Sequence, residues 1–138
     1  MTGEVMVIDL TLLSSATDRL AEGLARHHLA PTDAQLRDGL IQRFEFTYDL
    51  AHKMLRRALA INAAEPNEIE RLSFGAMIRS AWAEGLTGHE WAEWKQWRDM
   101  RNITSHTYHE QKARDVVASI PDFLIAARDV LIRIPARA

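Results

Sequence analysis

The chain has 138 residues, of which 47% are hydrophobic, and it carries 17 lysines and arginines against 19 aspartates and glutamates. This composition is typical of one globular domain, 1–138, that is long enough to bury its own core. The absence of cysteine excludes disulfide scaffolds, cysteine-ligated zinc sites and thiol nucleophiles. A formal net charge of −2 argues against binding of long nucleic acid by bulk electrostatics, so any contact with RNA or a nucleotide must be local.

The N-terminal segment carries no sign of a targeting sequence. Residues 1–13 have no basic region before their short apolar run, and no stretch approaches the roughly 20 apolar residues that a membrane span requires. We therefore expect a soluble, cytoplasmic protein without a membrane partner.

Apolar residues recur at helical spacing along almost the whole chain, which predicts an all-α fold. The expected architecture is an up-and-down four-helix bundle with an additional short helix, five helices in all. The first helix is expected over residues 9–26. A second, long helix is expected to start at a Thr32 N-cap, with Gln35 completing a capping box, and to reach about residue 61. Its two apolar sides indicate a central or interfacial position.

The middle of the chain contains a connection and a third helix. Residues 62–71 include Pro66 and several acids, and they are expected to form an exposed connection. The third helix is expected over residues 74–84, between Ser73 as its N-cap and Gly85 as its stop.

A fourth helix carries three tryptophans. Thr87 and Glu90 are spaced as a second capping box, which predicts the start of this helix. Trp91, Trp94 and Trp97 follow in steps of three, and each step drifts by about 60° around a helix, so the three rings cannot share one narrow face. We expect two of them in the core and one at the edge of an interface; the functional alternative is that they stack on RNA bases.

The last helix is expected to begin near Glu110 or Gln111 and to keep its apolar phase beyond Pro121. A proline ring clashes with the carbonyl four residues earlier, here that of Val117. The sequence therefore predicts a kink or a short break at Pro121, with both halves sharing one core.

Residues 98–109 concentrate the polar groups that can carry chemistry. Arg101 and His106 are five residues apart, so on one continuous helix they would diverge by about 140°. They converge only if the helix ends between them or if a second subunit supplies the partner. The β-branched and small residues at 103–105 favour such an ending.

An arginine and a histidine beside a phosphate would suit metal-free RNA cleavage. The histidine exchanges a proton with the attacking 2′-hydroxyl or the leaving 5′-oxygen, and the guanidinium stabilises charge on the phosphorane. Asn102 is placed to orient the histidine or the phosphate. The alternative is a structural polar network, because arginine and histidine near a helix C-terminus are favoured by the helix dipole alone. Spacing does not decide between these two interpretations.

Other kinds of site lack the residues that they need. His106 and His109 are three apart, but no cysteine or acidic pair completes a metal site. Ser105 has no nucleophile-elbow glycine pattern. Gly85 and Gly88 lack the lysine or further glycine of a phosphate-binding loop. We therefore expect no metal and no cofactor.

The order Arg101-Asn102-x-x-x-His106-x-Tyr108 resembles the Arg-x(4 to 6)-His motif of HEPN domains. It has the form found in HepT-like proteins and in the related nucleotidyltransferase substrate-binding proteins. Residues 42–50 and 78–86 resemble the second group as well, in the same order along the chain. The likeness covers about residues 36–132, so the whole chain is expected to be one HEPN-like helical domain.

This resemblance implies a five-helix bundle that forms a homodimer, with the Arg-His motifs of two subunits facing one cleft. It also implies a partner encoded nearby, a minimal nucleotidyltransferase with a polymerase-β-like domain. Some relatives of this kind are ribonuclease toxins, and in some pairs the nucleotidyltransferase adds AMP to the motif tyrosine; others are substrate-binding subunits. Carried over to this chain, Arg101 and His106 are the candidate catalytic pair, Asn102 is their polar support, and Tyr108 is the candidate acceptor of AMP.

The leading hypothesis is thus a HEPN-type partner of a minimal nucleotidyltransferase, a toxin-antitoxin component with metal-independent endoribonuclease activity. The alternative is a non-catalytic subunit that binds a substrate or nucleotide for the nucleotidyltransferase. A third hypothesis is a helical interaction module whose motif has no catalytic role.

Overall fold

The computed structural model describes residues 8–106 and 108–137, which form six α-helices and one 3₁₀-helix. In chain order these are α1 (Thr11–Leu29), α2 (Ala34–Asn62), α3 (Pro66–Arg71), α4 (Phe74–Ala83), α5 (Trp91–Asn102), η1 (Thr104–His106) and α6 (Glu110–Arg137). The described residues contain no strand, so the predicted all-α fold is confirmed. The N-terminal tail before Ile8, and Thr107 within the motif segment, lie outside the described residues.

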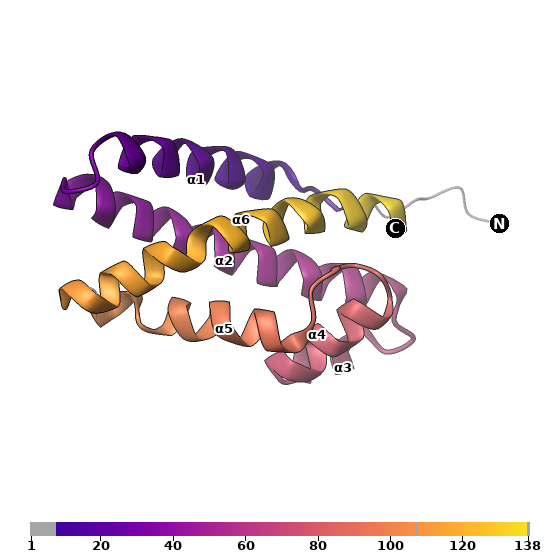
Figure 1. Ribbon diagram of the computed structural model, residues 1–138. Coiled ribbons are helices and arrows are strands. Elements are labelled where there is room, and N and C mark those ends of the chain that lie inside the picture. The colour runs from indigo at the N-terminus through magenta and orange to yellow at the C-terminus, as the bar shows by residue number, and fades with distance from the viewer. Residues whose placement is uncertain (1–7, 107, 138) are drawn as a thin grey trace.

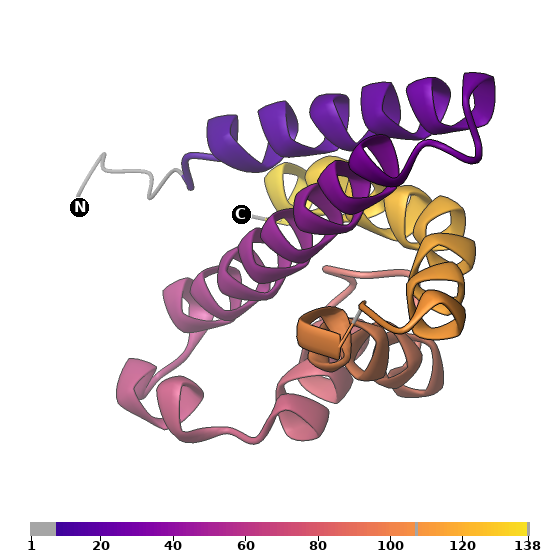
Figure 2. The same ribbon diagram turned by 90° about the vertical axis from the view of Figure 1, so that its left-hand side faces the viewer.

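Helix α2 occupies the centre of the fold, as its two apolar sides predict. It contacts α1 along one side and α6, α4 and α5 along others. The four long helices α1, α2, α5 and α6 alternate in direction, and the short α3 and α4 turn the chain at one end of the bundle (Figure 1). Figure 2 shows α6 crossing between the α1–α2 pair and α5.

Aromatic side chains fill the centre of the core. The rings of Phe44 on α2 and Phe123 on α6 meet edge to face, with centroids 5.1 Å apart. The Trp94 and Trp97 rings also meet edge to face at 5.1 Å, and Trp97 lies 5.8 Å from Phe123. All four side chains are buried, so the Trp94 and Trp97 indoles are core residues and are not available to stack on bases.

Helix α2 starts one residue later than the predicted capping box. The side chain of Asp33 accepts hydrogen bonds from the backbone N–H groups of Gln35 and Leu36, at 2.9 and 3.1 Å. The prediction of Thr32 as N-cap was therefore wrong. Aspartate and threonine are both good N-cap residues, and the adjacent Asp33 provides a carboxylate that binds two free amides at once.

The expected connection at 62–71 is partly helical, since it contains α3. This helix begins with Pro66 in its first turn, where an N–H group has no partner within the helix, so the missing N–H of proline removes no helical hydrogen bond. This short helix raises the number of α-helices from the predicted five to six within the described residues. The predicted start of α4 at Phe74 is confirmed, and the helix ends at Ala83, one residue before the predicted end. Ser73 Oγ accepts from the N–H of Ala76, and Gly85 adopts a positive φ of 77° after the helix ends.

The start of α5 differs from the prediction, because Glu90 is the N-cap and makes no capping hydrogen bond with its side chain. Thr87 has another role. Its hydroxyl accepts from the N–H of His89 at 3.2 Å and from the indole N–H of Trp94 at 3.1 Å. The buried indole needs this acceptor, so the long-range contact takes the hydroxyl that a capping box would use.

Helix α6 runs from Glu110 to Arg137 without a break at Pro121. Its ribbon changes direction between the orange and the yellow parts in Figure 2, which agrees with the predicted kink. Residues on both sides of the proline, such as Val116 and Val130, are fully buried in the same core.

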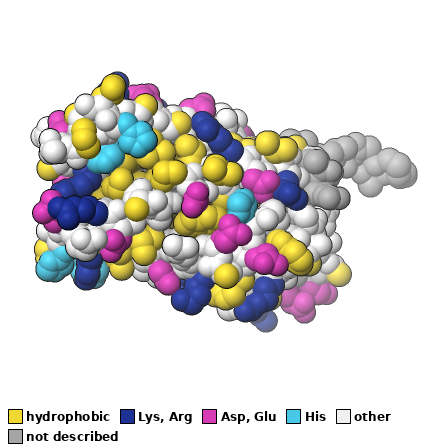
Figure 3. Space-filling view, viewed as in Figure 1, with side chains coloured by type: hydrophobic (Ala, Val, Ile, Leu, Met, Phe, Trp, Pro, Cys, Tyr) yellow, Lys and Arg dark blue, Asp and Glu magenta, His cyan; other side chains and the backbone are white. Residues whose placement is uncertain are grey.

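The surface carries no large region of one charge on the face shown in Figure 3, where acidic and basic side chains are interspersed around hydrophobic ones. No helix of the described residues combines the length and the hydropathy that a membrane crossing would need.

Candidate functional site

The helix that carries the motif ends inside it. Helix α5 stops at Asn102, and Ile103 follows with φ −92° and ψ 2°. The chain then tightens into the 3₁₀ turn η1, which contains His106. The predicted end of the helix between Arg101 and His106 is therefore confirmed, and the two residues do not belong to one continuous α-helix.

The Arg101 guanidinium is held by two carboxylates of α2. Its Nε donates to Asp49 Oδ1 at 2.9 Å and its Nη2 donates to Asp49 Oδ2 at 3.2 Å, a two-point contact. The same Nη2 lies 3.2 Å from Glu45 Oε1. Such two-point pairing fixes the plane of the guanidinium as well as its position.

Thr104 links the carboxylates to the end of the helix. Its hydroxyl donates to Glu45 Oε2 at 3.1 Å and lies 2.8 Å from the Arg101 carbonyl oxygen. Arg101 Nη1 is 3.4 Å from this hydroxyl. We call Glu45, Asp49, Arg101 and Thr104 the carboxylate clamp.

The clamp keeps its arginine charged. Hydrogen bonding to Asp49, and the negative charges of Asp49 and Glu45, raise the pKa of Arg101, while partial burial opposes the shift. Beneath the clamp, burial raises the pKa of Tyr48 above its usual range, so this phenol stays neutral. Tyr48 is a core residue.

The other motif residues lie at the surface. Asn102 and His106 are exposed, and 78% of Tyr108 is accessible. The His106 and Tyr108 rings are 6.3 Å apart between centroids. No hydrogen bond joins Arg101 to His106 within the described part of the chain, so the structure places the two in one short segment without direct contact.

This arrangement holds the Arg101 guanidinium in a fixed orientation on the same short segment as an exposed imidazole. Part of the guanidinium remains accessible, since the Arg101 side chain is 27% exposed. A phosphate that reaches Arg101 has to share it with Asp49 and Glu45. The clamp therefore combines features of both interpretations of the motif, a structural network around the arginine and a free histidine one turn further on.

Sequence reasoning missed the two carboxylates. Glu45 and Asp49 lie four apart on α2, and they belong to the block at 42–50 that resembles other proteins of this kind. That spacing puts both on one helix face, which was a usable signal for an acidic partner. Their pairing with Arg101 spans 52 residues of sequence, and local patterns carry no information about it.

Within the described residues no group of three or more histidine, cysteine, aspartate or glutamate side chains is placed to hold a metal ion.

Comparisons with known proteins give consistent results. The chain matches the family model described as nucleotidyltransferase substrate binding protein like over residues 8–135. It is 43% identical over 93 residues to a Haemophilus influenzae protein called probable ribonuclease HepT. That match covers 67% of this chain, and it spans 63% of the length of the relative. The chain is also similar to a solved Haemophilus influenzae structure, described as the fold of a substrate binding domain of a nucleotidyltransferase. The TM-score is 0.86 and the sequence identity is 35%. The similarity covers 92% of this chain and 99% of the other chain.

Proposed function

The chain belongs to the nucleotidyltransferase substrate binding protein like family, and on this premise we propose that it is the HEPN-type partner of a minimal nucleotidyltransferase and a metal-independent endoribonuclease of a toxin-antitoxin pair. The relative called probable ribonuclease HepT supports the choice of reaction. The proposed catalytic residues are Arg101 and His106, with Asn102 as their polar support.

One structural observation carries this proposal. Helix α5 ends between Arg101 and His106, and one short segment carries both a guanidinium of fixed orientation and an exposed imidazole. In the reaction, the 2′-oxygen attacks the phosphorus while histidine takes the 2′-hydroxyl proton. The bond from phosphorus to the 5′-oxygen breaks, and that oxygen receives a proton from a second histidine. The products are a 2′,3′-cyclic phosphate and a 5′-hydroxyl end.

A homodimer supplies the second histidine. Each subunit has one Arg101 and one His106, and two copies facing a shared cleft provide a base and an acid for the same phosphate. Arg101 stabilises the charge that develops on the phosphorane.

Expression of the chain alone tests this proposal. We expect wild type to slow growth and to degrade cellular RNA, and the His106→Ala variant to be harmless. If both proteins leave growth and RNA equally intact while accumulating to the same level, the ribonuclease proposal is wrong.

The partner is expected to act on Tyr108. This side chain is 78% exposed, so its hydroxyl is open to an approaching enzyme. Incubation with the neighbouring nucleotidyltransferase and ATP should add the mass of AMP, with release of pyrophosphate, and a Tyr108→Phe chain should not gain it. Unchanged mass of wild type in a complex that is shown to form would contradict this role.

A second candidate function is a non-catalytic subunit that binds a substrate or nucleotide for the nucleotidyltransferase. The carboxylate clamp favours it, because the positive charge of Arg101 is already matched by Asp49 and Glu45. Stable co-purification with the nucleotidyltransferase, together with no RNA cleavage by wild type, would support this function over the first. Absence of a complex at micromolar concentrations would count against it.

A further inference from the structure

A second arginine lies on the α2 side of α5, one helical turn before Arg101. Arg98 and Arg101 are three residues apart, so they share a face and are separated by about 4.5 Å along the helix axis. The Arg98 guanidinium lies over the ring of Phe74, 5.3 Å from its centroid. The aromatic face holds the side chain in place without neutralising it.

Arg98 differs from Arg101 in its partners. Arg101 is paired with two carboxylates, whereas Arg98 has no ion pair in the described part of the chain. The adjacent Asp99 is directed to Lys95, with Asp99 Oδ2 and Lys95 Nζ 3.0 Å apart. Arg98 is also exposed. Its charge is therefore available to an anion in solution.

His52 of α2 completes the surroundings of the same phenyl ring. The His52 and Phe74 rings meet edge to face, with centroids 4.7 Å apart. Arg56 Nη2 lies 3.3 Å from His52 Nε2. Because a guanidinium only donates, Nε2 has to accept and the proton of the neutral ring is on Nδ1. Burial and the charge of Arg56 lower the pKa of His52, in agreement with a neutral ring. The Nδ1–H group is thus a donor on a ring that packs against the same phenyl ring as Arg98.

We propose that Arg98 and His52, which flank the Phe74 ring, form a subsite for an RNA phosphate next to the phosphate that Arg101 binds. The chain of the RNA then follows the line between α2 and α5, from η1 past the carboxylate clamp toward α4 (Figure 1).

This inference rests on the proposed ribonuclease function, and it adds where the substrate is held. The reasons are the spacing and the charge. The two arginines lie three residues apart on one face of α5, so one RNA strand can reach both. Asp49 and Glu45 together outweigh the positive charge of Arg101 and give the clamp a net charge of about −1, so the attraction for the RNA backbone has to come from Arg98. Since the site is a local one, it also agrees with a chain whose net charge is −2.

The test is RNA binding in a His106→Ala background, which prevents cleavage. The probe is a fluorescent single-stranded oligonucleotide of about 12 nucleotides, and a second arm uses ATP. Arg98→Ala is compared with Arg79→Ala. Arg79 is a stringent control because it is an exposed arginine that lies over a neighbouring aromatic ring, that of Trp91 at 5.5 Å, but belongs to α4 and not to α5.

We expect Arg98→Ala to weaken RNA binding about five- to tenfold and to reduce the salt dependence of log K by about 0.7, the value for one contact to a single strand. Arg79→Ala should change neither quantity. His52→Ala should weaken binding less and leave the salt dependence unchanged, because a neutral donor releases no counterion.

Three results would overturn the subsite. The first is equal RNA binding by Arg98→Ala and Arg79→Ala, and the second is no RNA binding by any of these proteins. The third is an Arg98→Ala variant that loses ATP binding but binds RNA as well as its parent protein does. Binding that depends on Arg98 in a protein whose wild type leaves RNA uncut would support the subsite and contradict the ribonuclease. The two proposals can therefore fail separately.

Discussion

At the residue scale, Asp49 determines how Arg101 is presented. Its carboxylate receives both Nε and Nη2 of the guanidinium, at 2.9 and 3.2 Å. Without the Asp49 carboxylate, Arg101 would keep only Glu45 as a carboxylate partner, and its guanidinium could rotate. We expect Asp49→Ala to lower kcat for RNA cleavage about tenfold without raising KM, because loss of a negative charge does not weaken attraction for RNA, whereas a misdirected guanidinium stabilises the transition state poorly.

The pair itself adds little to stability, since the Asp49 side chain is 54% exposed. Unfolding of Asp49→Ala in urea should show a loss of about 1 kcal/mol or less. A purely structural clamp would give the opposite pattern, a large loss of stability at unchanged kcat.

His52 makes the stability of the fold depend on pH. Folding lowers its pKa through burial and through the charge of Arg56. As pH falls below about 6.5, the unfolded chain therefore takes up a proton at this residue before the folded chain does, and stability decreases. Above that pH both states are neutral and the residue adds no pH dependence.

We expect His52→Gln to lose less stability than wild type between about pH 7.5 and pH 5.5, as measured by thermal unfolding. Equal losses in the two proteins would show that folding does not perturb His52.

At the element scale, two glycines should respond to alanine in opposite ways. Gly85 ends α4 with a φ of 77°, and the N–H of Leu86 donates to the Ala81 carbonyl at 2.9 Å. An added Cβ at Gly39, inside α2, would meet nothing within 4 Å. In urea unfolding we expect Gly85→Ala to lose about 1–2 kcal/mol and Gly39→Ala to gain about 0.5–1 kcal/mol. A gain at Gly85 would contradict the conformation at the end of α4.

Most elements could be predicted from the sequence, because their signals are local. The apolar stripes of α1, α2 and α6 and the caps of α4 depend only on residues within one or two turns. The errors have two causes. At Thr32, a second capping residue follows immediately. At Thr87, a buried indole 7 residues away binds the hydroxyl, and the pattern Thr-x-x-Glu contains no information about that partner.

One part of the candidate site could be predicted from the sequence and another part could not. The end of α5 between Arg101 and His106 could be predicted from the small and β-branched residues that follow the arginine. The carboxylate clamp could not, because it requires α2 and α5 to be packed against each other. The two-point contact with Asp49 makes Arg101 an oriented cation and not a free one.

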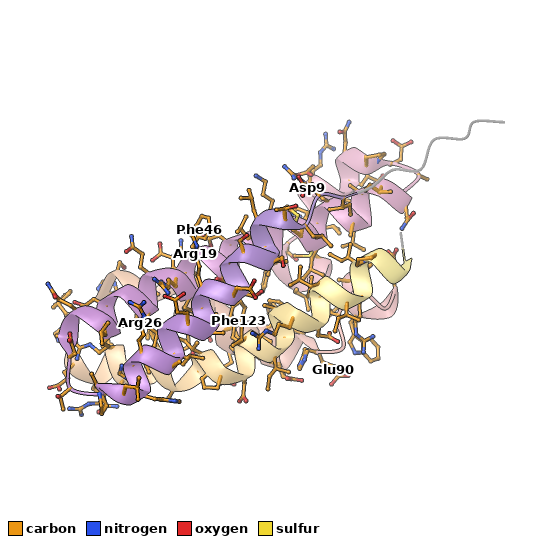
Figure 4. The ribbon with its side chains drawn as sticks, turned by 90° about the horizontal axis from the view of Figure 1, so that it is seen from above. Asp9, Arg19, Arg26, Phe46, Glu90 and Phe123 are labelled. Atoms are coloured by element: carbon orange, nitrogen blue, oxygen red, sulfur yellow. The ribbon has the colours of Figure 1, made fainter. Side chains whose placement is uncertain are left out.

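At the scale of the whole molecule, the proposed homodimer needs an apolar contact surface. Phe46 is 56% exposed and lines a groove between α1 and α2, near Arg19 (Figure 4). The groove has a volume of about 790 Å³, and Leu12 also contributes to it. Exposed apolar side chains around a groove are typical of protein interfaces.

We expect light scattering to show a dimer for wild type and a monomer for Phe46→Lys. Ile132→Lys is the control, because Ile132 is 73% exposed on α6 and does not line this groove, so it should remain dimeric. A dimer that persists in Phe46→Lys would place the interface elsewhere.

Cleavage of a defined RNA by the purified protein in EDTA measures whether Arg101 and His106 catalyse metal-independent cleavage. Wild type is predicted to produce fragments ending in a 2′,3′-cyclic phosphate, and a 2′-deoxy substitution at the cut position should block the reaction. Arg101→Ala and His106→Ala, folded as judged by circular dichroism, should each lose at least about a hundredfold in rate. RNA that stays intact with wild type, or that is cut equally well by both variants, would contradict the assignment of this pair to catalysis.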